Sequence, residues 1–240
     1  INSYVDELLN FSKFYSMFND ACESSTKEWL VDNKIYFHEI QYNVQEITRV
    51  IQALKLFRVT QIIPLLYSIF THYKRSNQKN KDKLISLFQT FEKYHFTNNI
   101  ICGRVANEVE KFYANSAKAI SLDKENELAE NIIVTDREKD DKFINHLKSK
   151  KAKRDEFTSQ FIDIIYYSKR NVPIINYLFD RINNKRNSKK ITGGNYITIY
   201  DPSISYQKRN YNIEHLLSQK FLNEKDENFN SDVIHQIGNL

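Results

Sequence analysis

The scarcity of glycine and proline is the feature that most restricts the fold of this chain. Only four Gly and three Pro occur among 240 residues. These two residues form most tight turns, which a fold built from many short strands needs in large numbers, and both are disfavoured inside helices. Hydrophobic residues make up 41% of the chain, enough for a sizeable buried core. The composition therefore predicts a mainly α-helical protein and argues against a turn-rich all-β fold.

Hydrophobic periodicity predicts a bundle of about five helices in the first 120 residues. In the first of them, Leu8, Phe11, Phe14, Tyr15 and Phe18 recur at three- and four-residue steps, the period of one helix face. Four later segments repeat this pattern. The five predicted helices are 3–18, 43–57, 59–74, 82–96 and 104–120. Pro64 lies in the first turns of the third predicted helix, where proline is tolerated.

Aromatic and histidine side chains in this bundle are best explained as structural. Aromatic residues such as Phe88, Phe91, Phe112 and Tyr113 stand at core spacing. Four histidines occupy helical or loop positions with no evident partner in the sequence, and we expect all four to be structural: His38, His72, His95 and His146.

A change of composition near residue 150 predicts a second domain. Residues 121–150 are highly charged and predict a linker or an exposed helix, so that 1–150 would form the helical bundle domain and 151–240 a separate unit. Two more helices are predicted over 157–169 and 172–184, the latter with Pro173 in its first turn. The segment "YITIY" then follows Gly193 and Gly194, as a strand follows a turn. We expect a small α+β piece at the C-terminus of an otherwise helical protein.

Positive charge is concentrated in the same C-terminal part. Residues 148–220 hold fifteen Lys and Arg against six Asp and Glu, a net charge of +9, which leaves −4 for the rest of the chain's total of +5. A basic third joined to a mildly acidic body is typical of a polyanion-binding module on a scaffold. Solvated helix faces rich in lysine explain the charge equally well.

Two cysteines, Cys22 and Cys102, stand far apart and form neither a zinc motif nor a disulfide framework. We expect two buried thiols in a reducing cytoplasm.

No apolar run approaches the ~20 residues that cross a bilayer, so no membrane association is expected. The sequence begins at Ile1 rather than Met, which predicts that it is a fragment of a longer protein.

The segment "RNYNIEHLLSQK" (209–220) carries the most chemical information. If it is a strand, Ile213, His215 and Leu217 share one face, while Glu214 and Leu216 lie on the other. By itself this describes a half-buried structural histidine with a solvated glutamate. A second short segment with a β-like pattern, "VIHQIGNL", ends the sequence and holds Gly238 and Asn239. One loop and one return strand fit between the two. His235, in the second segment, is expected to be strand surface.

Together these two segments resemble a known family. "IEHLLSQ" followed by "HQIGNL" is similar to the HNH-type nuclease domain at the C-terminus of GmrSD-like, modification-dependent (type IV) restriction enzymes. That family has an Ile-Glu-His-Ile-x-Pro-Gln signature and then a Gly-Asn-Leu-Thr-Leu signature. The matching residues are Ile213, Glu214, His215, Gln219, Gly238, Asn239 and Leu240. More weakly, 175–183 and 96–120 resemble helices that precede the signature.

The sequence departs from the family pattern at three points. Ser218 stands where the family usually has Pro, which changes the turn after the histidine but removes no catalytic group. The family continues past Leu240 with a helix that gives the metal a further Asn or His, so we expect the nuclease domain here to be truncated. The family's N-terminal NTP-hydrolysing domain, with its Asp-Gly-Gln-Gln-Arg signature, is also missing from the sequence.

The resemblance implies a ββα-metal domain that hydrolyses phosphodiesters with Mg²⁺ or Mn²⁺. His215 would be the general base, since an imidazole with a pKa around 6.5 can take a proton from water at neutral pH. Glu214 takes the place of the acidic metal ligand, and oxygen ligands suit Mg²⁺ or Mn²⁺. Asn239 matches the asparagine that braces the motif.

The partner implied by the resemblance is double-stranded DNA, specifically modified phage DNA. Basic residues near the expected site would contact phosphates without reading sequence: Lys185, Arg186, Lys189, Lys190, Lys208 and Arg209. No helix-turn-helix or zinc-finger pattern is present. The alternative interpretation is a non-catalytic helical module that docks a partner or binds nucleic acid, with Glu214 and His215 in structural roles.

Overall fold

The computed structural model describes residues 2–36, 40–75, 81–122, 142–162 and 171–188. Backbone contacts divide the chain into two compact units, Ile1–Lys151 and Ala152–Leu240. About 85% of the described part is helical and it contains no strand, which confirms the prediction of a mainly α-helical protein. Of the predicted ββα-metal domain (151–240), only 151–162 and 171–188 are described, and its expected strands and site lie outside the described residues.

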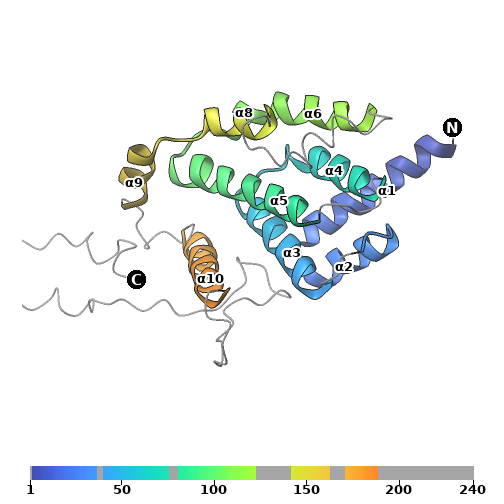
Figure 1. Cartoon of the computed structure of the whole chain (residues 1–240), viewed down its shortest axis with the longest axis horizontal. Helices are drawn as coiled ribbons and strands as arrows, with labels where there is room; N and C mark the ends of the chain where they lie inside the picture. The colour runs from blue at the N-terminus through green and yellow to red at the C-terminus, as the bar shows by residue number, and fades with distance from the viewer. Residues whose placement is uncertain (1, 37–39, 76–80, 123–141, 163–170, 189–240) are drawn as a thin grey trace, which may run out of the picture. The chain divides into compact units, whose positions relative to one another are not determined.

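The first unit is a helical bundle (Figure 1). Its helices are α1 (Asn2–Asp20), α2 (Glu23–Asp32), α3 (Ile40–Leu56), α4 (Ile63–Arg75), α5 (Lys81–His95), α6 (Glu110–Leu122) and α8 (Lys142–Lys150). A π-helix, η1 (Phe96–Ile101), continues α5, and a 3₁₀ turn, η2 (Ala106–Val109), precedes α6. The second unit contains α9 (Arg154–Ile162) and α10 (Val172–Ser188) among its described residues.

Helix α3 lies at the centre of the bundle, and its apolar face is buried as predicted. It packs on α5 and also contacts α1 and α2, while α4 packs on α1 and α6. Six side chains of its predicted apolar pattern are at most 6% exposed: Val44, Ile47, Val50, Ile51, Leu54 and Phe57. The sequence pattern therefore identified this core helix correctly.

A chain of aromatic contacts crosses the core from α1 to α5. Phe14 meets Trp29 edge-on with ring centroids 4.9 Å apart, and Trp29 in turn lies 5.2 Å from Phe70. Phe88 stacks edge-on against Phe70 at 4.9 Å. Because each edge-to-face pair adds ~1 kcal/mol to the burial of its rings, these contacts stabilise the arrangement of four helices at once.

Three helix ends adopt the left-handed backbone conformation without glycine, and the first is Ala21, which follows α1 with φ 50°. Lys34 follows α2 with φ 57° and Arg58 follows α3 with φ 60°. After Arg58, the amide of Val59 donates to the carbonyl of Leu54, and that of Arg58 to Lys55, both at 3.0 Å, which is a Schellman C-cap. Val59 is fully buried, so the apolar contact of this cap is also present. These helix ends are thus closed by residues that give no glycine signal.

The structure corrects several details of the predicted bundle. Helix α2 was not predicted, so six helices rather than five precede residue 123, and the predicted helix 104–120 begins with η2 instead. The predicted stripe on α1 is only partly covered, because Leu8 and Tyr15 are 50% and 49% exposed while Phe14 and Phe18 are buried. Helix α10 runs four residues further than predicted. Pro64 and Pro173 are second residues of their helices, as expected of tolerated prolines.

Candidate functional site

The residues predicted to form the nuclease site lie almost entirely outside the described part of the chain. His215, Glu214 and Asn239 are not described, nor are four of the predicted phosphate contacts: Lys189, Lys190, Lys208 and Arg209. Lys185 and Arg186 are placed by their backbone in the last turn of α10. The structure neither brings the three catalytic candidates together nor separates them, so their roles stay predictions.

The described part of the basic segment exposes its charges at the end of α8. Lys148, Lys150 and Lys151 have exposed side chains, and we call these three residues the α8 basic end. The carbonyl of Lys150 accepts hydrogen bonds from Arg104 Nη1 and from Asn98 Nδ2, both at 2.9 Å. Terminal carbonyls of a helix attract cationic donors, so these contacts hold the helix end in place and add a guanidinium beside the lysines.

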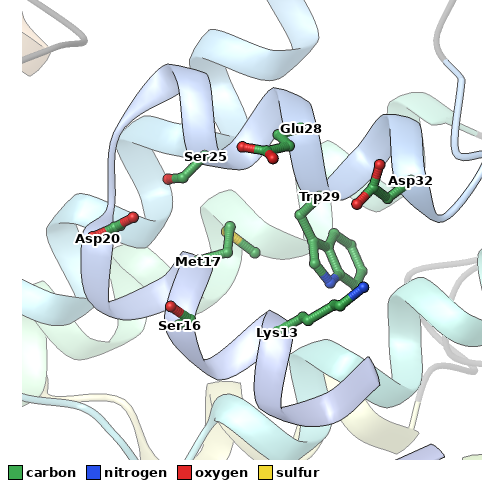
Figure 2. A pocket seen from close by; sticks show the side chains of 8 residues that line it. All are labelled: Lys13, Ser16, Met17, Asp20, Ser25, Glu28, Trp29 and Asp32. Atoms are coloured by element: carbon green, nitrogen blue, oxygen red, sulfur yellow. The ribbon is translucent and has the colours of Figure 1, made fainter. Parts of the chain in front are cut away.

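A pocket of about 290 Å³ opens between α1 and α2 (Figure 2). Its lining comprises Lys13, Ser16, Met17 and Asp20 from α1 and Ser25, Glu28, Trp29 and Asp32 from α2. The two helices are held at this angle by Ala21, which has φ 50° and whose carbonyl accepts a 2.7 Å hydrogen bond from Gln52 Nε2 of α3. Lys55 Nζ also donates to the carbonyl of Asn19.

The charges around this α1/α2 pocket are predominantly negative. Three carboxylates, from Asp20, Glu28 and Asp32, face a single ammonium group from Lys13. Trp29 forms an apolar wall and is only 5% exposed. Carboxylate oxygens accept hydrogen bonds from cations and repel phosphates, so this pocket is unsuited to a DNA backbone. Within the described ranges, no group of three or more His, Cys, Asp or Glu is placed to hold a metal ion.

Cys22 lies at the N-cap of α2, beside this pocket. Its Sγ is 3.2 Å from both Ser24 Oγ and Ser25 Oγ. Burial raises the pKa of the thiol, but hydrogen bonds from Ser24 and Ser25 together outweigh that effect, so the pKa lies below its ordinary value. Neither cysteine forms a disulfide, and each is half-buried rather than buried as predicted.

Three of the histidines expected to lack partners have them. His95 is fully buried, with Nδ1 2.5 Å from Asn99 Oδ1 and Nε2 2.9 Å from Tyr113 Oη. His146 stacks on Phe112 with ring centroids 4.0 Å apart. His72 is 2% exposed within α4, where it also has a partner. His38 falls outside the described residues. The contacts of His95 and His146 pair neither histidine with a carboxylate, so the structural role expected for these two residues fits their surroundings.

Comparison with models of known protein families, with curated proteins and with solved structures finds no match to this chain. Among the described helices, none combines the length and the apolar character that crossing a membrane requires. The function must therefore be argued from the residues themselves.

The α1/α2 pocket and the Cys22 cap were missed by sequence analysis. The pocket combines residues of two helices, one of which was not predicted, and its lining residues follow no contiguous motif. The only signal of this pocket in the sequence is a pair of acidic residues four positions apart, Glu28 and Asp32. They flank Trp29, the single tryptophan of the chain.

Proposed function

We propose that the chain belongs to a metal-dependent DNA endonuclease with an HNH-type active site. The observation that carries the proposal is the pair of segments "IEHLLSQ" and "HQIGNL", which resemble the two signatures of the GmrSD-like, modification-dependent restriction enzymes. They share with these signatures, in the same order, Ile213, Glu214, His215, Gln219, Gly238, Asn239 and Leu240. The substrate of such an enzyme is double-stranded DNA, here modified phage DNA. The reaction is phosphodiester hydrolysis by an activated water.

In this proposal three of the matched residues each have one task. His215 accepts the proton from the attacking water, and Asn239 holds the histidine-bearing segment in position. Glu214 provides a carboxylate ligand, a hard oxygen donor that suits Mg²⁺ or Mn²⁺ better than zinc. A divalent cation, when bound, supplies the positive charge that stabilises the transition state and the leaving oxygen.

The exposed α8 basic end supports a nucleic-acid partner. Lys148, Lys150 and Lys151 present three ammonium groups to solvent, and Arg104 lies next to them through its bond to the Lys150 carbonyl. Phosphate contacts of this kind give affinity that depends on salt and not on sequence. The acidic α1/α2 pocket, which also lies in the first unit, is by the same argument not part of a DNA path.

A second candidate function is a non-catalytic module that binds nucleic acid through these basic residues. It is favoured by the exposed lysines of the α8 basic end, which can bind phosphates without any catalytic group. The two candidates differ in one property: both bind DNA, but only the endonuclease breaks it.

Incubating supercoiled plasmid with the full-length protein separates the two candidates. With Mg²⁺ or Mn²⁺ present, the endonuclease produces open-circular and linear DNA, and EDTA abolishes this product. Plasmids carrying modified and unmodified bases are compared in parallel, since modification dependence predicts faster cleavage of the former. Salt-sensitive binding without nicking of either plasmid would favour the non-catalytic module.

A further inference from the structure

An apolar groove of about 450 Å³ lies between α1 and α6, with α4 as its floor. Tyr4 and Leu8 project from the α1 side and are 67% and 50% exposed. Val5 and Leu9, one residue further round the same helix, are 55% and 54% exposed. Figure 1 shows the first turns of α1 extending beyond the neighbouring helices of its unit. Four large apolar side chains on two turns form a contiguous patch, which is typical of an interaction surface.

The two walls of this α1/α6 groove differ in size. The α1 wall is bulky, whereas the α6 wall consists, apart from Lys118, of the small residues Ala114, Ala117 and Ser121. Phe11 and Tyr67 cover the floor, with ring centroids 5.2 Å apart. Ser68 Oγ and Ser121 Oγ lie 3.1 Å apart and hold α4 against α6, so the groove is fixed by contacts within the unit.

The walls also differ in charge. Glu7 lines the groove from α1 and Lys118 lines it from α6, and both side chains are exposed. A surface that is bulky and acidic on one side and small and basic on the other is complementary to itself. A two-fold axis through the groove exchanges the walls, so that each bulky wall meets a small one and each Glu7 meets a Lys118.

We propose that the α1/α6 groove is the interface of a two-fold homodimer of this chain. Leu8 and Tyr4 of one copy fill the space above Ala114 and Ala117 of the other, and the two Glu7–Lys118 pairs fix the register. This proposal concerns a different surface from the endonuclease site, and either can hold without the other.

Sedimentation velocity of the 240-residue chain tests the proposal directly. At concentrations up to about 100 µM we expect a species of twice the 28.6 kDa chain mass. Leu8→Glu places a charge in the apolar contact and is expected to leave only monomer. Val31→Glu is the matched control, because Val31 is 51% exposed on α2 outside the groove, and it should dimerise like the parent. Circular dichroism confirms that each variant is folded.

A charge exchange provides a second test that does not depend on the apolar contact. Glu7→Lys and Lys118→Glu each place like charges opposite one another in a homodimer, and each should weaken self-association about ten-fold. An equimolar mixture of the two variants restores both opposite-charge pairs and should form heterodimers as tightly as the parent forms homodimers. A monomeric parent, a Leu8→Glu dimer, or a mixture no tighter than its components would overturn the proposal.

Discussion

His95 Nε2 lies 2.9 Å from Tyr113 Oη at the contact between α5 and α6, and both side chains are fully buried. The carbonyl oxygen of the Asn99 side chain can only accept, so the Nδ1 of His95 carries the proton and donates to it. Nε2 therefore accepts from the Tyr113 hydroxyl. Burial lowers the pKa of His95 to about 4, despite the opposing effect of Asn99, and burial raises the pKa of Tyr113 well above its ordinary value.

This pair predicts a specific loss of stability in mild acid. Because the folded pKa of His95 is about 4 and the unfolded pKa is near 6.5, the unfolded chain binds more protons between these values. The free energy of unfolding is therefore complete above pH 6.5 and falls by roughly 3 kcal/mol as the pH drops toward 4. Urea denaturation at a series of pH values measures this. His95→Gln should flatten the curve over this window, whereas an unchanged slope would contradict the assignment.

Replacing Arg58 with glycine is expected to stabilise the protein. It is exposed and holds φ 60°, a backbone conformation that costs a non-glycine residue ~1 kcal/mol. Arg58→Gly should therefore raise the free energy of unfolding by about 0.5–1 kcal/mol. Lys111→Gly is the matched control, because Lys111 is exposed within α6, where glycine should destabilise by about 1 kcal/mol. Both changes are measurable by thermal denaturation, and a destabilised Arg58→Gly variant would contradict the strain argument.

The ion pair between Glu46 and Arg49 predicts a strong non-additive effect. Arg49 Nη1 lies 2.6 Å from Glu46 Oε1 within α3, and Gln89 Nε2 of α5 donates to Glu46 Oε2 at 3.1 Å. Arg49→Met leaves a buried carboxylate without its guanidinium and should cost about 3–5 kcal/mol. Glu46→Leu combined with Arg49→Met removes both charges and should cost clearly less. A loss in the double variant equal to the sum of the losses in Arg49→Met and in Glu46→Leu, all measured in urea, would show that the charges do not interact.

Much of this bundle was predictable because its helices are long and strongly periodic. Helix α3 is the best example, since its whole apolar pattern is buried as expected. Helix α2 was missed for a physical reason. Its three buried residues are Thr26, Trp29 and Leu30, of which one is polar, and its N-cap is Cys22 rather than a usual capping residue. A pattern of two apolar residues is too short to indicate a helix.

Helix ends and surface coverage were less predictable than helix positions. Lys34 and Arg58 close helices in a left-handed conformation that usually indicates glycine, so the sequence marked neither end. The stripe on α1 was predicted correctly as apolar, but periodicity does not reveal whether another element covers it. For the proposed nuclease site, sequence similarity alone identified the residues, because two short segments, 213–219 and 235–240, carry the specific part of the match.

The α8 basic end predicts the salt dependence of DNA binding. Replacing Lys148, Lys150 and Lys151 with Gln removes up to three phosphate contacts, which should lower the slope of log affinity against log salt by up to about 3. Replacing Lys27, Lys93 and Lys111, which are equally exposed on other helices, removes the same charge and should leave the slope nearly unchanged. Fluorescence anisotropy with a labelled duplex measures both. Equal slopes for the two triple variants would exclude α8 from the DNA interface.

The most direct test of the account is the plasmid-nicking rate of the full-length protein carrying His215→Ala, compared with His235→Ala. The first variant removes the proposed general base, and the second removes an imidazole from the neighbouring signature segment that has no proposed role. With Mg²⁺ or Mn²⁺ present, we expect His215→Ala to nick about 10²–10⁴-fold more slowly and His235→Ala to nick at the parental rate. A His215→Ala protein that nicks as fast as the parent would contradict the central claim.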